Sequence, residues 1–143
     1  MSASLLALLL YATWTLLLLA GIAALRVAKT LSGARRANQF APSGEDVSPF
    51  SGRLCRAHAN CYENLPIVAA IILVAASTGH GAITDPLALW LVAARLAQSL
   101  VHLASTRSRM VMLRFAFMLA QVLILICWLA QLLPLALASA GVA

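Results

Sequence analysis

The sequence predicts an all-α integral membrane protein, a four-helix bundle that crosses the bilayer. Two observations support this prediction. Apolar residues make up 63% of the 143 residues and charged residues only 10%, whereas typical soluble domains are about 45–50% apolar and about 25% charged. In addition, four apolar stretches follow one another along the chain, and roughly 20 apolar residues are enough for one helical crossing. The composition therefore argues against a soluble globular or a disordered protein.

The first two stretches predict helices over about residues 4–32 and 53–77. The run from Leu5 to Leu25 carries no charge; it is too long for the apolar segment of a signal peptide and lacks the positive leader. The second stretch is cleanly apolar only from Leu65 to Ala76. Because that run is too short to span the bilayer, the helix must extend back through polar residues to about Arg53.

The other two helices are predicted over about residues 86–105 and 110–138. The third opens on a proline, which fits the first turn of a helix, and the fourth contains Arg114 near its start and Pro134 near its end. A polar loop rich in glycine and proline, residues 33–52, joins the first two helices. The whole chain, 1–143, is predicted to be a single transmembrane domain.

The basic residues predict the orientation. Nine of the ten lie at or near the side of the first and third loops, and the opposite side has no Lys or Arg. Cytoplasmic loops carry the excess of basic residues, so we expect that side to be cytoplasmic and both termini to lie outside. Topology and lipid headgroups then explain most of the net charge of +6, and no nucleic-acid partner is expected. The nine residues are Arg26, Lys29, Arg35, Arg36, Arg53, Arg56, Arg107, Arg109 and Arg114.

Polar residues also form a stripe inside the two central spans. Polar groups within the hydrocarbon are rare and face the bundle interior. With a rise of about 1.5 Å per residue, Glu63 and Arg95 both lie ~15 Å from the cytoplasmic ends of their antiparallel helices. We therefore predict an ion pair between them near mid-membrane, although such pairs can also serve only to fix helix register. The stripe consists of Arg53, Arg56, Asn60 and Glu63 on the second helix and Arg95, Gln98 and His102 on the third.

The stripe has a cationic excess towards the cytoplasm. Arginine suits carboxylates because its planar guanidinium binds them through two parallel hydrogen bonds. A small anion with several carboxylates is the ligand that this pattern favours.

The segment from Arg53 to Pro66, RLCRAHANCYENLP, resembles the signature R-x-x-R-A-H-x-N-x-x-E-N-x-P of the MAPEG family, the membrane-associated proteins in eicosanoid and glutathione metabolism. Shorter matches are Gly33 to Ala37, Ala94-Arg95 through His102, and Leu113-Arg114. The chain is similar to bacterial members that resemble microsomal glutathione transferases.

This resemblance implies a homotrimer of four-helix protomers in the bacterial inner membrane, with glutathione as co-substrate at subunit interfaces open to the cytoplasm. Lipophilic small molecules would enter from the bilayer, and membrane lipids surround the protein. Arg114 is the implied thiolate activator, with Arg109 as the competing candidate because loop lengths differ. No metal site is expected. The implied glutathione-binding residues are Arg35, Arg36, Arg53, Arg56, Asn60, Glu63, Arg95, Gln98 and His102.

Three functions remain open at this stage. The first is a glutathione-dependent transferase or peroxidase, in which a cation lowers the pKa of the glutathione thiol. The second is a non-catalytic lipid-binding or scaffold protein of the same family. The third is a small proton-coupled exporter, which needs a carboxylate free to titrate. The predicted pairing of Glu63 with Arg95 argues against the exporter.

Overall fold

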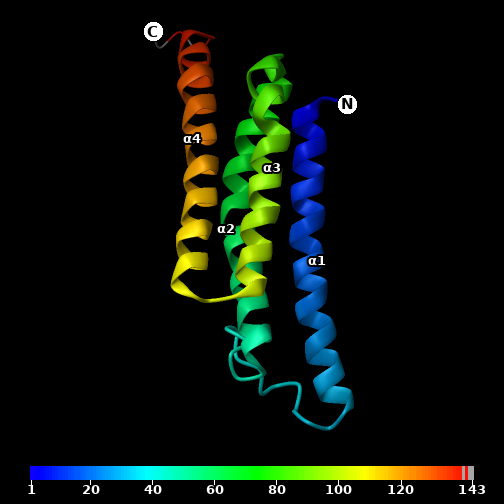
Figure 1. The fold of residues 1–143 in the computed structure, drawn as a ribbon. Helices are drawn as coiled ribbons and strands as arrows, with labels where there is room; N and C mark the ends of the chain where they lie inside the picture. Colours follow the sequence, from blue (N-terminus) through cyan, green and yellow to red (C-terminus); the bar gives the residue numbers. More distant parts are fainter. Residues whose placement is uncertain (140, 142–143) are drawn as a thin grey trace.

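A computed structural model describes residues 1–139 and residue 141, and over that part the chain forms a bundle of long helices (Figure 1). All four are long and apolar enough to cross a membrane, which agrees with the predicted all-α membrane bundle. Residues 140, 142 and 143 of the predicted domain lie outside the described residues. The helices are α1 (Ala3–Leu31), α2 (Pro49–Ser77), α3 (Gly81–Ala104) and α4 (Ser108–Ser139).

The helices run antiparallel to their chain neighbours. Figure 1 shows the start of α1 and the end of α4 at the same end as the α2–α3 turn, here called the terminal end. The loop of residues 32–48 and the short turn of residues 105–107 lie at the opposite end, here called the loop end. Helix α3 packs against all three other helices, α2 packs closely on α1 and more sparsely on α4, and α1 does not contact α4.

Two helices begin earlier than the sequence suggested. Helix α2 starts at Pro49 because Ser48 caps it: the Ser48 side chain accepts a hydrogen bond from the Ser51 amide at 3.0 Å, and proline fits the first helical position. Helix α3 starts at Gly81, five residues before Pro86. The missing N–H of Pro86 falls within the first two turns, where it removes only one helical hydrogen bond.

The core is largely apolar, with buried polar side chains at the start of α1 and near the middle of the bundle. Trp128, Tyr11, Ile72 and Leu91 are the largest fully buried side chains. The Tyr11 hydroxyl donates to the Cys61 carbonyl at 3.1 Å, which ties α1 to the middle of α2. The outer faces carry many exposed leucines, valines and isoleucines, as expected where a helix meets lipid or another apolar protein surface.

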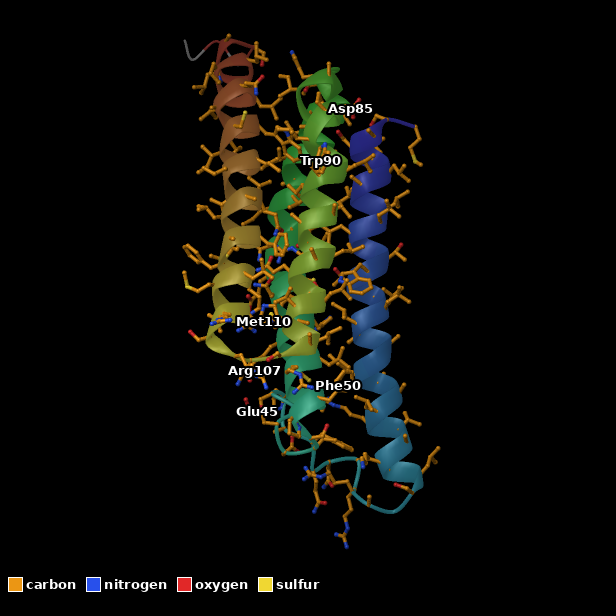
Figure 2. All side chains as sticks on the ribbon, in the orientation of Figure 1. Glu45, Phe50, Asp85, Trp90, Arg107 and Met110 are labelled. Carbon is orange, nitrogen blue, oxygen red and sulfur yellow. The ribbon has the colours of Figure 1, made fainter. Side chains whose placement is uncertain are left out.

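Asp85 of α3 anchors α1 at the terminal end. One carboxylate oxygen accepts from the Ser4 amide at 2.9 Å and from the Ser4 hydroxyl at 2.6 Å, and the Ser4 hydroxyl also lies 2.7 Å from the Thr84 hydroxyl. Figure 2 shows Asp85 beside the start of α1, far from Glu45 and Arg107 at the loop end. A carboxylate at a helix N-terminus satisfies a free amide and opposes the helix dipole.

We expect the change Asp85→Ala to lower the free energy of unfolding by ~1 kcal/mol, because α1 loses a capping acceptor. Asp85→Asn, which keeps an acceptor oxygen and loses the charge, should lose less. Reversible unfolding in mixed detergent micelles measures both. Equal stability of wild type and Asp85→Ala would show that the contact contributes nothing to holding α1.

Candidate functional site

Arg95 lies at the centre of the polar interior. It is 2% exposed, and its Nη1 donates to both the carbonyl oxygen of Asn60, at 3.2 Å, and the side-chain Oδ1 of Asn60. Its guanidinium also stacks over the Tyr11 ring, with 5.5 Å from Cζ to the ring centroid. A cation over an aromatic face gains electrostatic energy, more so where water is excluded. Arg95 is thus held by α1 and α2 together.

The predicted Glu63–Arg95 ion pair is wrong. The salt bridges found among the described residues are Arg35–Asp46 and Arg56–Glu45, and Glu63 is exposed on the surface of the protomer. Equal depth in the membrane fixes only the height of a residue on its helix. Glu63 lies three residues beyond Asn60, which at 3.6 residues per turn is about 300° round the helix, or 60° short of a full turn, and that offset turns it away from α3.

Arg95 determines which way the Asn60 amide points. A guanidinium can only donate hydrogen bonds, so Asn60 must present its oxygen to Arg95. The NH2 group of Asn60 is then directed away from Arg95 and is free to donate elsewhere. The burial of Arg95 favours this supporting role over direct contact with a ligand.

Gln98 has a partner that the sequence reasoning missed. The Gln121 amide of α4 donates to Gln98 Oε1 at 2.9 Å, and both side chains are 2% exposed. The signal was present: Gln121 lies seven residues after Arg114, on the same face of α4, and Trp128 follows after seven more. Gln98 therefore joins α3 to α4, and its burial also favours a supporting role.

His102 and Arg114 form a second link between α3 and α4, closer to the loop end. Arg114 Nη1 lies 2.9 Å from His102 Nδ1, and both side chains are half-buried. Since the guanidinium must donate, His102 Nδ1 accepts, and a neutral ring then carries its proton on Nε2. The contact places the positive charge of Arg114 directly beside the His102 ring. The pair presents N–H donors beside concentrated positive charge, an arrangement suited to an anion.

A cleft of about 400 Å³ opens at the loop end beside α2. Two sequence-predicted residues line it and differ in their contacts. Arg53 Nε donates to the Leu103 carbonyl at 2.8 Å and so caps the C-terminal end of α3. Arg56 is exposed and forms an ion pair with Glu45 of the loop. The lining residues are Glu45, Pro49, Gly52, Arg53, Arg56 and Thr106.

The other predicted arginines at the loop end, Arg35, Arg36 and Arg109, do not line this cleft. Arg35 is held by Asp46 through both the carboxylate and the backbone carbonyl, within the loop itself. Arg36 and Arg109 are exposed. The structure thus buries Arg95 and Gln98, leaves Arg36, Arg56, Arg109 and Glu63 exposed, and half-buries the other predicted residues.

Comparisons with known proteins agree with the sequence signature. A profile of the MAPEG family matches residues 4–134, which is most of the chain. No curated protein and no solved structure shows significant similarity to the chain.

We expect Arg95 to couple energetically to Asn60 and not to Glu63 of the same chain. In double-mutant cycles, Arg95→Ala with Asn60→Ala should give a coupling of ~1–3 kcal/mol, as for a hydrogen bond to a charged group. Arg95→Ala with Glu63→Gln should give less than ~0.5 kcal/mol. Unfolding in mixed micelles provides the free energies. A larger coupling energy of Arg95 to Glu63 than to Asn60 would mean that Arg95 does pair with Glu63.

Proposed function

The chain belongs to the MAPEG family, and from that premise we propose that it is a glutathione-dependent membrane transferase or peroxidase. Its substrates would be lipophilic electrophiles or hydroperoxides that enter from the bilayer. The observation that carries the proposal is the arginine cleft of Arg53 and Arg56 at the same end of the bundle as the His102–Arg114 pair. The arginines of the cleft suit the carboxylates of glutathione, and the His102–Arg114 pair suits its thiolate.

In this proposal glutathione binds through its carboxylates. Arg56 takes one of them, because it is exposed and its guanidinium can form two parallel hydrogen bonds. The Asn60 NH2 group, oriented by Arg95, donates to the bound tripeptide, and a loop arginine, Arg35 or Arg36, reaches a second carboxylate. The cleft volume of about 400 Å³ is within the usual range of small-molecule pockets, ~300–1,000 Å³.

Arg114 activates the thiol. The thiolate is the nucleophile, and a fixed positive charge lowers a thiol pKa because it favours the charged form. A guanidinium carries its positive charge permanently in proteins, and the contact with His102 fixes where that of Arg114 lies. The thiolate then attacks an electrophilic carbon and forms a thioether, either by displacing a leaving group or by adding to an activated double bond that then takes up a proton. With a hydroperoxide, the thiolate attacks the terminal oxygen and breaks the O–O bond, so that the alkoxide leaves and is protonated to the alcohol. The resulting glutathione sulfenic acid reacts with a second glutathione to give the disulfide and water.

Glu63 supports the proposal that the protein is a trimer. It is the central residue of α2 and is exposed on the protomer. A carboxylate facing lipid at the middle of a membrane helix costs ~2.5–3.5 kcal/mol or more. We propose that a second subunit covers this face, so that the glutathione site is completed between protomers with its opening towards the cytoplasm.

The structure changes the argument about the two alternative functions, the proton-coupled exporter and the non-catalytic scaffold. The exposed position of Glu63 removes the pairing argument against a proton-coupled exporter, and the family membership takes its place. A non-catalytic lipid-binding or scaffold role is the outcome if glutathione binds without being activated.

We expect Arg56→Ala and Arg114→Ala to differ in kinetics. Losing Arg56 should mainly raise KM, because the carboxylate contact is the same in the ground and transition states. Losing Arg114 should mainly lower kcat, because the sulfur charge matters most at the reacting centre. Steady-state assays with a lipophilic electrophile give both constants.

Thiolate absorbance tests the activation directly. Adding glutathione to wild type should give a thiolate signal, which Arg114→Ala should lose while still binding glutathione. Arg109→Ala is the matched control and should keep the signal. If wild type binds glutathione without forming thiolate, the enzyme proposal fails in favour of the scaffold.

We also propose that the loop end is cytoplasmic and that both termini lie outside, since the basic residues gather at the loop end. Alkaline phosphatase fused to the C-terminus should be active and a fluorescent protein fused there should be dark. An inactive phosphatase and a bright fluorescent protein at the C-terminus would place the loop end, and with it the site, outside the cytoplasm.

A further inference from the structure

The loop of residues 32–48 supplies a carboxylate to the arginine cleft. Glu45 forms an ion pair with Arg56, and both residues line the same cleft. Figure 2 shows Glu45 at the loop end of the bundle. The side chains are 57% and 58% exposed, so the pair is open to solvent and accessible to a dissolved anion.

Close packing of the loop on α2 fixes the position of Glu45. Gly44 has a φ of +67°, and a Cβ at that position would lie 2.6 Å from Cys55 Sγ and 2.8 Å from Ser51 Oγ. A Cβ on Gly52 would lie 2.9 Å from Glu45 Cγ. The loop and the first turns of α2 thus pack so closely at these two glycines that neither position has room for a side chain of its own. An exposed ion pair alone is too weak to impose such a position.

Asp46, the next residue in the loop, also pairs with an arginine. Asp46 binds Arg35 through its carboxylate and its backbone carbonyl, and the carboxylate also accepts from the Ala41 amide at 3.2 Å. Two successive loop carboxylates therefore occupy Arg56, to which the proposed function assigns a carboxylate of glutathione, and Arg35, one of the two loop arginines proposed for the second carboxylate. Asp46 has several partners within the loop, whereas Glu45 has Arg56 as its ion-pair partner.

We infer that Glu45 is a resident carboxylate that occupies Arg56 in the ligand-free protein and is displaced by a carboxylate of the incoming ligand. This inference rests on the proposed function, because it takes Arg56 as a ligand-binding residue. Resident and ligand carboxylates make the same kind of contact with the guanidinium, so they compete for it. An anion therefore binds Arg56 only if its contact with the guanidinium is strong enough to displace Glu45. This competition favours carboxylate ligands over anions that bind a guanidinium more weakly.

The effect on affinity should be moderate. Exposed ion pairs of this kind are weak, so removing the competing carboxylate should tighten binding by roughly two- to fivefold. We expect Glu45→Gln to lower the Kd of glutathione by that factor, measured by calorimetry on the full-length protein in detergent. Asp85→Asn is the matched control: it removes the same charge at the terminal end and should leave the Kd unchanged.

A double mutant shows whether the effect acts through Arg56. In an Arg56→Ala background, Glu45→Gln should no longer change the Kd, because the residue for which the carboxylates compete is gone. Weaker binding by Glu45→Gln would overturn the inference, since it would mean that Glu45 stays in place and binds a positive group of the ligand. An unchanged Kd would overturn it as well.

A second measurement needs no glutathione. Phenylglyoxal modifies guanidinium groups, and a paired carboxylate protects Arg56. In the ligand-free protein, Arg56 should react at least twofold faster in Glu45→Gln than in wild type, by peptide mass spectrometry, with the exposed Arg36 as internal reference. An equal rate would contradict the resident pair. Failure of the proposed function looks different: no variant binds glutathione, while faster modification in Glu45→Gln still supports the pairing of Glu45 with Arg56.

Discussion

A single buried cation, Arg95, determines how the polar interior of this bundle is built. In the hydrocarbon region no water satisfies a buried polar group, so its partners must come from the protein. Arg95 takes the carbonyl and side-chain oxygens of Asn60 and the face of Tyr11, and no carboxylate within the described protomer pairs with it. The guanidinium thereby fixes α3 against α1 and α2 and leaves the Asn60 amide with a defined orientation.

The polar links divide the bundle into levels. Around the middle, Arg95 and Gln98 join α3 to α2 and α4 through buried contacts. Closer to the loop end, His102 and Arg114 are half-buried, and Arg56 is exposed beside the cleft. Accessibility thus increases towards the side that carries the basic residues. The buried level holds the helices in register, and the accessible level is the one that a water-soluble anion can reach.

Much of the fold followed from the sequence, and the limits of that prediction have physical causes. Length and apolarity gave the four helices, and periodicity put Asn60 and Arg95 on facing stripes. Periodicity placed Glu63 on the same stripe as Asn60, but the offset of about 60° between the two residues leaves Glu63 exposed, so the partner of Arg95 was misjudged. Gln121 was missed because α4 is strongly apolar and carries two glutamines, Gln121 and Gln131, and only the seven-residue spacing from Arg114 distinguishes the buried one. The pairing of Glu45 with Arg56 depends on how a loop folds back, which periodicity does not encode.

The position of Arg95 in the third helix has a consequence for biosynthesis. Helices α2 and α3 are the less apolar members of the bundle, and α1 and α4 are strongly apolar. A lone α3 entering the bilayer would carry an arginine without partners, at a cost of several kcal/mol. Synthesis runs from the N-terminus, so Tyr11 and Asn60 have already emerged from the ribosome when Arg95 reaches the membrane. The order of the helices thus lets α3 be inserted next to a helix that can already accept the hydrogen bonds of Arg95, and α4 arrives last to satisfy Gln98.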